Sequence, residues 1–202
     1  MKARTVARKS SNRRIQSANM ASIIPDIVSS LILRSAGDSR PIVLMTCGIA
    51  GSGKSTLAKA IVASYPSFTR ISIDEIIYSR HGLYGKDYPP SKYDEYQAEA
   101  DDIYLEQFQQ LLQDGKNIVL DRSFYSREDR MEFKGMIEKA GARCVLVYFK
   151  ADRDTLWRRI CERREKGVDA NCALEIDEGL LDQYVQGFEE PVGEGEVEVR
   201  VR

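Results

Sequence analysis

A glycine-rich segment between an apolar run and a helix-forming stretch constrains this chain more than any other feature. The apolar run is Ile42–Cys47, and residues 48–56 follow it with the pattern G-x-x-x-x-G-K-S-T. Glycines allow backbone conformations that a β-carbon would block, so successive N–H groups can converge on one anion. The dipole of the helix expected over residues 54–65 adds to the attraction. This context of strand, loop and helix predicts a phosphate-binding loop for a nucleoside triphosphate.

Each part of this loop has an expected ligand. The Lys54 amine can reach the β- and γ-phosphates of a nucleotide, and the Ser55 hydroxyl can ligate a metal ion. We therefore predict ATP and Mg²⁺ as cofactors. A glycine-rich turn with a chance lysine is the alternative, which the flanking strand and helix disfavour. The predicted nucleotide-binding residues are Gly48, Ile49, Ala50, Gly51, Ser52, Gly53, Lys54, Ser55 and Thr56.

Length and composition limit the remaining choices. The chain of 202 residues is long enough for one α/β domain with a sizeable core. Its formal net charge of −1 gives no general attraction to nucleic acid or membranes, and no apolar run has the length of a membrane span. The single histidine and the lack of a C-x-x-C pair disfavour a zinc site. Unpaired cysteines indicate a reducing compartment, and we expect the cytoplasm; they are Cys47, Cys144, Cys161 and Cys172.

The first 22 residues differ from the rest of the chain. They are basic, and no acidic residue precedes Asp26. We expect a disordered tail at residues 1–22; an organellar transit peptide, for instance mitochondrial, and translation from Met20 are the alternatives. The expected domain covers residues 23–202. Near its start, three apolar residues at helical spacing are expected to pack against it: Ile24, Ile27 and Leu31.

Strand-like and helix-like segments alternate along the rest of the chain. Such alternation predicts an α/β protein with a three-layer, doubly wound parallel sheet of about five strands. The expected strands cover residues 42–47, 70–73, 117–121, 144–149 and 196–202. The expected helices cover residues 54–65, 91–115, 126–141, 153–165 and 177–188, with Ser91, Ser126 and Asp152 as caps.

Two acidic residues are expected beside the phosphate loop, because the carboxyl ends of parallel strands meet at one edge of a sheet. Asp121 closes an apolar strand and is, with Ser55, a predicted metal ligand; capping of a turn is the alternative. Asp74 closes the second strand and could take a proton from an acceptor hydroxyl as a general base. Compensation of a helix dipole, together with Glu75, is its alternative role. Arg122 follows Asp121 where a hydrolase would have glutamate, which favours transfer to an acceptor over hydrolysis.

Two pairs of arginines carry the remaining candidate functions. Arg159 and Arg163 are four residues apart, so they share a helix face and could clamp a transferring phosphoryl group. A solvated, salt-bridged helix is the alternative, and spacing alone favours it. Arg127 and Arg130 are candidates for binding an anionic substrate, with surface charge as the alternative. Six of the ten tyrosines fall between the two acidic residues above and could stack on a base or sugar, although packing is the commoner role.

With these residues placed, the chain resembles the P-loop kinase superfamily over residues 41–188. It is most similar to the branch that contains the phage-type polynucleotide 5′-kinase domain, zeta toxin and gluconate kinase. The resemblance implies a small helical lid at residues 153–176. The matching residues are the loop at 48–56, the acceptor base Asp74, the strand-end acid Asp121 and the lid arginines Arg159 and Arg163.

The sequence departs from the polynucleotide kinases at two positions. Ile77 stands where they have an arginine that holds the substrate phosphate, and Arg122 stands where they have a small polar residue. Both departures disfavour a polynucleotide acceptor. Residues 121–130 and 188–191 are more similar to a group of small ATP-binding proteins in the same branch. The resemblance also implies that the turn at residues 188–195 contacts adenine.

We therefore expect an ATP-dependent phosphotransferase. It would move the γ-phosphoryl group of Mg-ATP to a hydroxyl group of a small molecule or of a nucleic-acid end. An ATP-binding switch or scaffold with little phosphotransfer is the first alternative, and a polynucleotide 5′-kinase tethered by the basic tail is the second. We expect no membrane partner, and the sequence leaves the acceptor and the oligomeric state open.

Overall fold

The computed structural model describes residues 23–33, 37–167 and 174–201. The predicted basic tail at residues 1–22 and Cys172 lie outside these residues. No helix in the described part of the chain is both long enough and apolar enough to cross a membrane. Within the described ranges, three cysteines carry free thiols: Cys47, Cys144 and Cys161.

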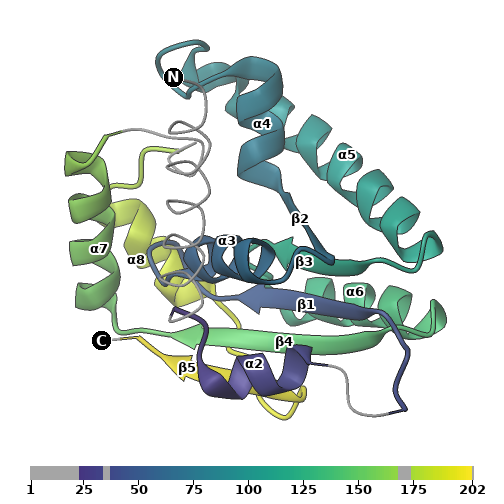
Figure 1. Ribbon diagram of the computed structural model, residues 1–202. Helices are drawn as coiled ribbons and strands as arrows, with labels where there is room; N and C mark the ends of the chain where they lie inside the picture. Colours follow the sequence, from purple (N-terminus) through teal and green to yellow (C-terminus); the bar gives the residue numbers. More distant parts are fainter. Residues whose placement is uncertain (1–22, 34–36, 168–173, 202) are drawn as a thin grey trace, which may run out of the picture.

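Five parallel strands form one sheet in the order β2-β3-β1-β4-β5 (Figure 1). The six residues of the central strand, β1, are all buried. Because helices cover both faces, such a strand reads as a continuous apolar run and not as an alternating one. The predicted doubly wound parallel sheet is therefore confirmed. The strands are β1 Ile42–Cys47, β2 Phe68–Ser72, β3 Asn117–Asp121, β4 Arg143–Lys150 and β5 Glu196–Arg200.

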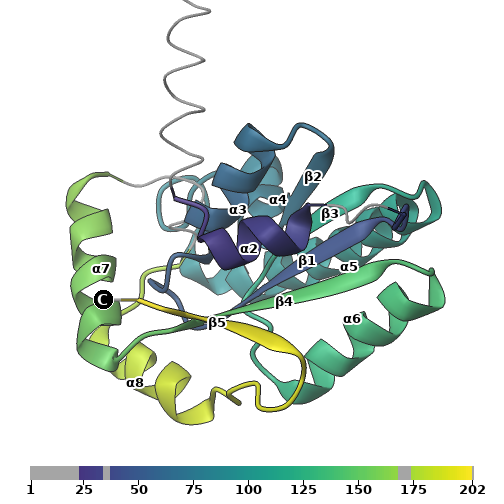
Figure 2. The same ribbon diagram turned by 60° about the horizontal axis from the view of Figure 1, so that its bottom comes forward.

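Helices complete the three layers of the fold (Figure 2). They are α2 Asp26–Ile32, α3 Lys54–Ser64, α4 Ile73–His81, α5 Tyr93–Gln113, α6 Arg127–Lys139, α7 Arg153–Glu165 and α8 Glu178–Gly187, with a 3₁₀ turn at Pro90–Lys92. Alternate residues of β1 point to opposite faces of the sheet. Val43 and Met45 join the core under α5 and α6, whereas Ile42 and Leu44 join the core under α2 and α3.

A third, smaller apolar cluster holds α7 and α8 together. Leu156 and Ile160 of α7 are buried against Leu181 of α8, and Ile49 of the phosphate loop packs on the same cluster. The helix pair follows the carboxyl end of β4 (Figure 1). One face of α7 is thereby fixed beside the phosphate loop.

Two of the three predicted helix caps are present. Ser126 and Asp152 each accept a hydrogen bond from the N–H group three residues on, at 3.1 Å and 2.8 Å, and begin α6 and α7. The predicted cap at Ser91 is wrong. Pro90 opens a 3₁₀ turn that contains Ser91, and α5 begins at Tyr93 without a side-chain cap.

The end of the second strand and the buried face of α2 also differ from the sequence prediction. The second strand ends at Ser72, and α4 begins at Ile73, so Asp74 lies in the first turn of a helix and not at the end of a strand. The predicted apolar face of α2 is also partly wrong, because Val28 is buried whereas Ile27 is 54% exposed. Ile24 is buried but precedes the helix, which begins at Asp26. Helical spacing counted from Ile24 therefore places Ile27 on the buried face of α2, although it is exposed.

Candidate active site

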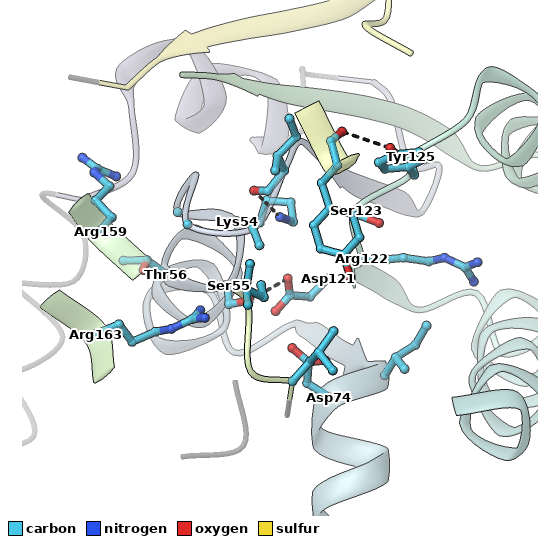
Figure 3. A pocket seen from close by; sticks show the side chains of 18 of the residues that line it. Lys54, Ser55, Thr56, Asp74, Asp121, Arg122, Ser123, Tyr125, Arg159 and Arg163 are labelled. Carbon is cyan, nitrogen blue, oxygen red and sulfur yellow. Dashed lines mark hydrogen bonds between the residues drawn. The ribbon is translucent and has the colours of Figure 1, made fainter. Parts of the chain in front are cut away.

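A cleft of about 1080 Å³ opens around the phosphate loop at the carboxyl ends of the strands (Figure 3). In a doubly wound sheet, ligands bind at this edge. The walls of the cleft come from the loop, the first turn of α4, one face of α5, the segment after β3, the start of α6, and α7 and α8. The predicted catalytic and metal-binding residues line it together: Lys54, Ser55, Asp74, Asp121, Arg159 and Arg163.

The shape of the loop requires glycine at two positions. Gly48 has a φ of 141°, and a β-carbon there would lie 2.9 Å from the carbonyl oxygen of Phe149. Gly51 has a φ of 84°, and a β-carbon there would lie 2.9 Å from the carbonyl oxygen of Leu156. Positive φ is strained for any other residue. The loop therefore lies tightly against the end of β4 and the first turn of α7.

Lys54 lies across the phosphate loop. Its Nζ atom donates a hydrogen bond of 3.0 Å to the carbonyl oxygen of Ile49. Burial lowers the pKa of the Lys54 amine, and the negative charges of Asp121 and Asp74 act in the opposite direction. The amine is thus placed among the groups that would surround a bound triphosphate.

Asp121 lies beside Ser55, as predicted for the two metal ligands. The Ser55 hydroxyl donates a hydrogen bond of 3.1 Å to Oδ1 of Asp121. The other carboxylate oxygen, Oδ2, accepts two hydrogen bonds from Arg70, at 2.9 Å from Nε and 2.5 Å from Nη2. Arg70 also pairs with Glu75 at the start of α4. Sequence reasoning missed Arg70, whose contact with Asp121 joins positions 51 residues apart.

The donor atoms beside the loop suit magnesium. Ser55 and Asp121 offer two hard oxygen atoms 3.1 Å apart. No group of three or more histidine, cysteine, aspartate or glutamate residues in the described ranges could hold a metal ion by itself. Magnesium is usually bound through one or two protein oxygens, with water and substrate phosphates as its other ligands. This pair of residues therefore fits Mg²⁺ bound together with a nucleotide.

Asp74 is a partly buried carboxyl group that lines the cleft. Burial, followed by the negative charge of Asp121, raises its pKa to about 6. The positive charges of Lys54 and Arg163 partly offset this rise. A carboxyl group with a pKa close to neutrality can both take and release a proton at the pH of a cell.

The two predicted lid arginines both reach the cleft from α7. A β-carbon at Gly53 would lie 3.7 Å from Nη1 of Arg159, so this guanidinium lies against the phosphate loop. The Arg163 side chain points toward Ser55 (Figure 3). The N-terminal end of α7 is held to α8, because Arg153 pairs with Asp182 at 2.8 Å. Both guanidinium groups therefore lie at the cleft, where the phosphate-clamping prediction requires them.

The other predicted arginine pair lies outside the cleft. Arg130 is completely buried, and its guanidinium donates to both carboxylate oxygens of Glu194, at 2.8 Å and 2.7 Å, and to the carbonyl oxygen of Phe124. The prediction that Arg130 binds substrate is therefore wrong: it ties the turn at residues 188–195 to α6. Arg127 is exposed and does not line the cleft, and its backbone N–H donates to Glu189.

The side of the cleft formed by α5 contains residues that sequence reasoning did not assign. Arg122 lies 3.1 Å from Asp101 and 3.5 Å from Asp129, measured between guanidinium nitrogen and carboxylate oxygen. Its guanidinium also lies 5.6 Å from the ring centre of Phe133. The three charged residues line the cleft with Tyr93. The sequence carried a signal for Arg122, which follows the strand-end acid, and for Tyr93, which is one of the six clustered tyrosines, but none for Asp101 or Asp129 as site residues.

Comparisons with known proteins identify the family and the fold of this chain. The family model described as an AAA domain matches residues 43–191. A search of curated proteins gives no match. One similar solved structure is a protein of Chloroflexus aurantiacus J-10-fl, described provisionally as a kinase, with a TM-score of 0.64 and 18% identity over 81% of this chain and 87% of that one.

Two other similar structures are P-loop kinases of known type. A gluconokinase of Sinorhizobium meliloti 1021 has a TM-score of 0.52 and 21% identity over 80% of this chain and 82% of that one. The APS kinase of Mycobacterium tuberculosis, in complex with AMPPNP and APS, has a TM-score of 0.53 and 14% identity over 81% and 90%. At these identities the likeness shows the fold alone. The family match covers most of the sequence, so the chain belongs to the AAA domain family, with the fold of the P-loop kinases.

Proposed function

We propose that this protein is a phosphotransferase that moves the γ-phosphoryl group of ATP to a hydroxyl group of an acceptor. The observation that supports the proposal most is the position of Asp74. A carboxyl group with a pKa of about 6 shares one cleft with the phosphate loop, the lid arginines and a pair of metal-binding oxygens. Phosphoryl transfer needs little from a protein beyond positioning, charge neutralisation and a group that receives the acceptor proton.

The phosphate loop would bind the nucleotide. Its backbone N–H groups, the N-terminus of α3 and the Lys54 amine would hold the β- and γ-phosphates. Ser55 and Asp121 would hold Mg²⁺, which when bound neutralises phosphate charge. Arg159 and Arg163 would stabilise the charge that spreads over the oxygens of the γ-phosphoryl group during transfer.

Asp74 would act as the general base. The acceptor oxygen forms a bond to the γ-phosphorus while the bond to the bridging oxygen breaks, so that ADP leaves and the hydroxyl proton passes to Asp74. At pH 7 most Asp74 carboxyl groups with a pKa of about 6 are ionised and able to accept that proton.

A second, smaller cavity supports a site for the nucleotide base. It measures about 90 Å³ and is lined by Ile49 of the phosphate loop, Tyr148 and Phe149 at the end of β4, and Phe188. The Phe188 and Tyr148 rings stack with their centres 5.9 Å apart. Aromatic rings next to the phosphate loop can stack on a purine ring, and Glu190 also lines this slot. We therefore propose that the start of residues 188–195 makes the predicted adenine contact.

A polynucleotide acceptor is less well supported than a small molecule. Ile77, which stands where the polynucleotide kinases have a phosphate-binding arginine, is completely buried in the core and does not line the cleft. A nucleotide-binding switch remains the alternative to test, and it predicts ATP binding without transfer of the γ-phosphoryl group.

Transfer can be tested without knowing the acceptor. The protein is incubated with γ-labelled ATP, Mg²⁺ and a small-molecule extract of cells, and labelled organic products are separated from labelled phosphate. We expect a labelled product with the wild type, and a rate reduced about 10²- to 10⁴-fold in Asp74→Asn. Asp102→Asn, an exposed position on α5, is the matched control. Label released only as phosphate would support the switch and contradict the proposal.

A further inference from the structure

The cleft is bounded on one side by a group of residues that we call the acceptor wall. These residues are Asp74, Tyr93, Asp101, Arg122 and Asp129, and all of them line the cleft. They come from α4, α5, the residue after β3, and α6. In Figure 3, Arg122 lies on the opposite side of Ser55 from Arg163.

Most of the positive charge of the cleft belongs to elements other than those of this wall, although Lys54 and Arg163 act on the pKa of Asp74. Apart from Arg122, the lysines and arginines that line the cleft belong to α3 or to α7 and the residue after it. They are Lys54, Lys59, Arg159, Arg163 and Lys166. This group can neutralise a triphosphate. The cleft is therefore polarised, with cations at the nucleotide end.

The charge of Arg122 does not give the acceptor wall a net positive charge. The wall holds three carboxyl groups against this one guanidinium. Nη1 of Arg122 lies 3.1 Å from Oδ1 of Asp101, and Nε lies 3.5 Å from Oδ2 of Asp129. Each contact is an ion pair with one carboxylate oxygen, and Oδ1 of Asp101 is buried and accepts no hydrogen bond from the described residues. The two carboxylates therefore keep capacity to accept hydrogen bonds from a ligand.

The surroundings of these carboxyl groups favour an additional cation. Burial raises the pKa of both Asp101 and Asp129, in opposition to the charge of Arg122. The pKa of Tyr93 is raised first by burial and then by the negative charge of Asp74. A ligand cation at this place would stabilise the ionised carboxylates, whereas a ligand anion would meet carboxylates of its own sign.

We propose that the acceptor is a hydroxyl compound that carries a protonated amine and no anionic group, such as an amino alcohol or an amino sugar. This inference rests on the proposed phosphotransferase function and names its substrate class. The amine lies against Asp101 and Asp129, where it donates to their carboxylate oxygens, and the hydroxyl reaches Asp74.

The substrate class can be measured before the substrate is identified. A small-molecule extract is divided by ion exchange into cationic, uncharged and anionic pools, and each pool is incubated with the protein, Mg²⁺ and γ-labelled ATP. We expect the labelled product from the cationic pool. Product from the uncharged or anionic pool overturns the inference and leaves the phosphotransferase function standing. ATP turnover with no labelled product from any pool contradicts the phosphotransferase function, and the inference fails with it.

Variants of the wall test the assigned contact with the compound found in this way. Asp101→Asn and Asp129→Asn each leave Arg122 one carboxylate partner, so the fold is expected to persist. Each is expected to raise the KM of the cationic acceptor about tenfold, with little change in the KM of ATP. Asp102→Asn, next to Asp101 but exposed, is expected to leave both constants unchanged. An unchanged acceptor KM in both wall variants would overturn the assignment.

Discussion

Arg70 donates two hydrogen bonds to a single oxygen of Asp121, at 2.9 Å from Nε and 2.5 Å from Nη2. The two side chains are only 6% and 3% exposed. This pairing occupies Oδ2 and leaves Oδ1 directed at the Ser55 hydroxyl. Arg70 therefore positions the carboxylate that would hold the metal ion, although it does not itself line the cleft.

Replacing Arg70 should weaken both the fold and the response to magnesium. Breaking a buried ion pair by removing one partner destabilises a protein by about 3–5 kcal/mol, so Arg70→Met should lower the free energy of unfolding by that order in urea titrations. Arg70→Lys keeps the charge but not the two-pronged donation, and should raise the magnesium concentration for half-maximal activity about tenfold. Arg80→Met, at an exposed ion pair, is the control. An unchanged magnesium response in Arg70→Lys would show that Arg70 does not position Asp121.

The pH dependence of turnover should report Asp74. Its pKa is raised to about 6, and only the ionised form can accept the acceptor proton. The rate should therefore be constant above pH 7 and fall about tenfold per pH unit below 6. Steady-state rates at saturating ATP, measured from pH 5 to 8, check this expectation. A rate that stays level down to pH 5 would exclude Asp74 as the base.

Asp74 should also make folding stability depend on pH. Its pKa in the folded protein, about 6, lies above the ordinary value of 3.8, so the folded state binds more protons between these values. Stability contributed by the protonated form is fully present below pH 3.8 and is lost as the pH rises through 6. Asp74→Asn should consequently unfold with a free energy on the order of 1–2 kcal/mol higher than wild type at pH 7, and with a smaller difference at pH 4. A less stable variant at pH 7 would contradict the assigned pKa.

The phosphate loop should not tolerate a β-carbon at Gly51. The added atom would lie 2.9 Å from the Leu156 carbonyl oxygen, at a φ of 84°. We expect Gly51→Ala to weaken ATP binding at least tenfold in calorimetric titrations. Gly135→Ala is the matched control, because that helical position has open space and should gain about 0.5–1 kcal/mol in stability. Equal ATP affinities in the two variants would show that the loop geometry is not what binds the nucleotide.

Arg130 should behave as a structural residue. It is buried against Glu194, so Arg130→Met should lower the free energy of unfolding by about 3–5 kcal/mol. Arg130→Met combined with Glu194→Gln should be less destabilised, because no unpaired buried charge remains. Wild-type KM values for ATP and acceptor in the folded fraction would agree with this role. A large rise in the acceptor KM at unchanged stability would contradict this role and would show that Arg130 takes part in substrate binding.

The parts of the site that depend on local sequence could be predicted. The phosphate loop needs only a strand, glycines and a helix in succession. Ser55 and Asp121 meet because strands β1 and β3 are parallel neighbours, so their carboxyl ends share an edge. Asp74 reaches the cleft even though the predicted strand end is in fact the first turn of α4. The error in the predicted end of the second strand did not change the prediction that Asp74 lies beside the phosphate loop.

The parts that depend on long-range packing could not be predicted. A charged residue on a helix is normally exposed, and only the return of the chain 64 residues later brings Glu194 to Arg130. The Arg70 contact depends on strand register, which sets Ser72 opposite Asp121. Asp101 is one of two adjacent acids on α5, and only the rotation of that helix decides that it, and not Asp102, faces Arg122.

Calorimetric titration of the protein with Mg-ATP tests the account most directly, because every assigned role depends on a triphosphate held by residues 48–56. The account predicts binding of one nucleotide per chain, which is lost when Lys54 is replaced by methionine in a variant that still folds. Absence of measurable binding of ATP to the wild type in the presence of magnesium would contradict the account as a whole.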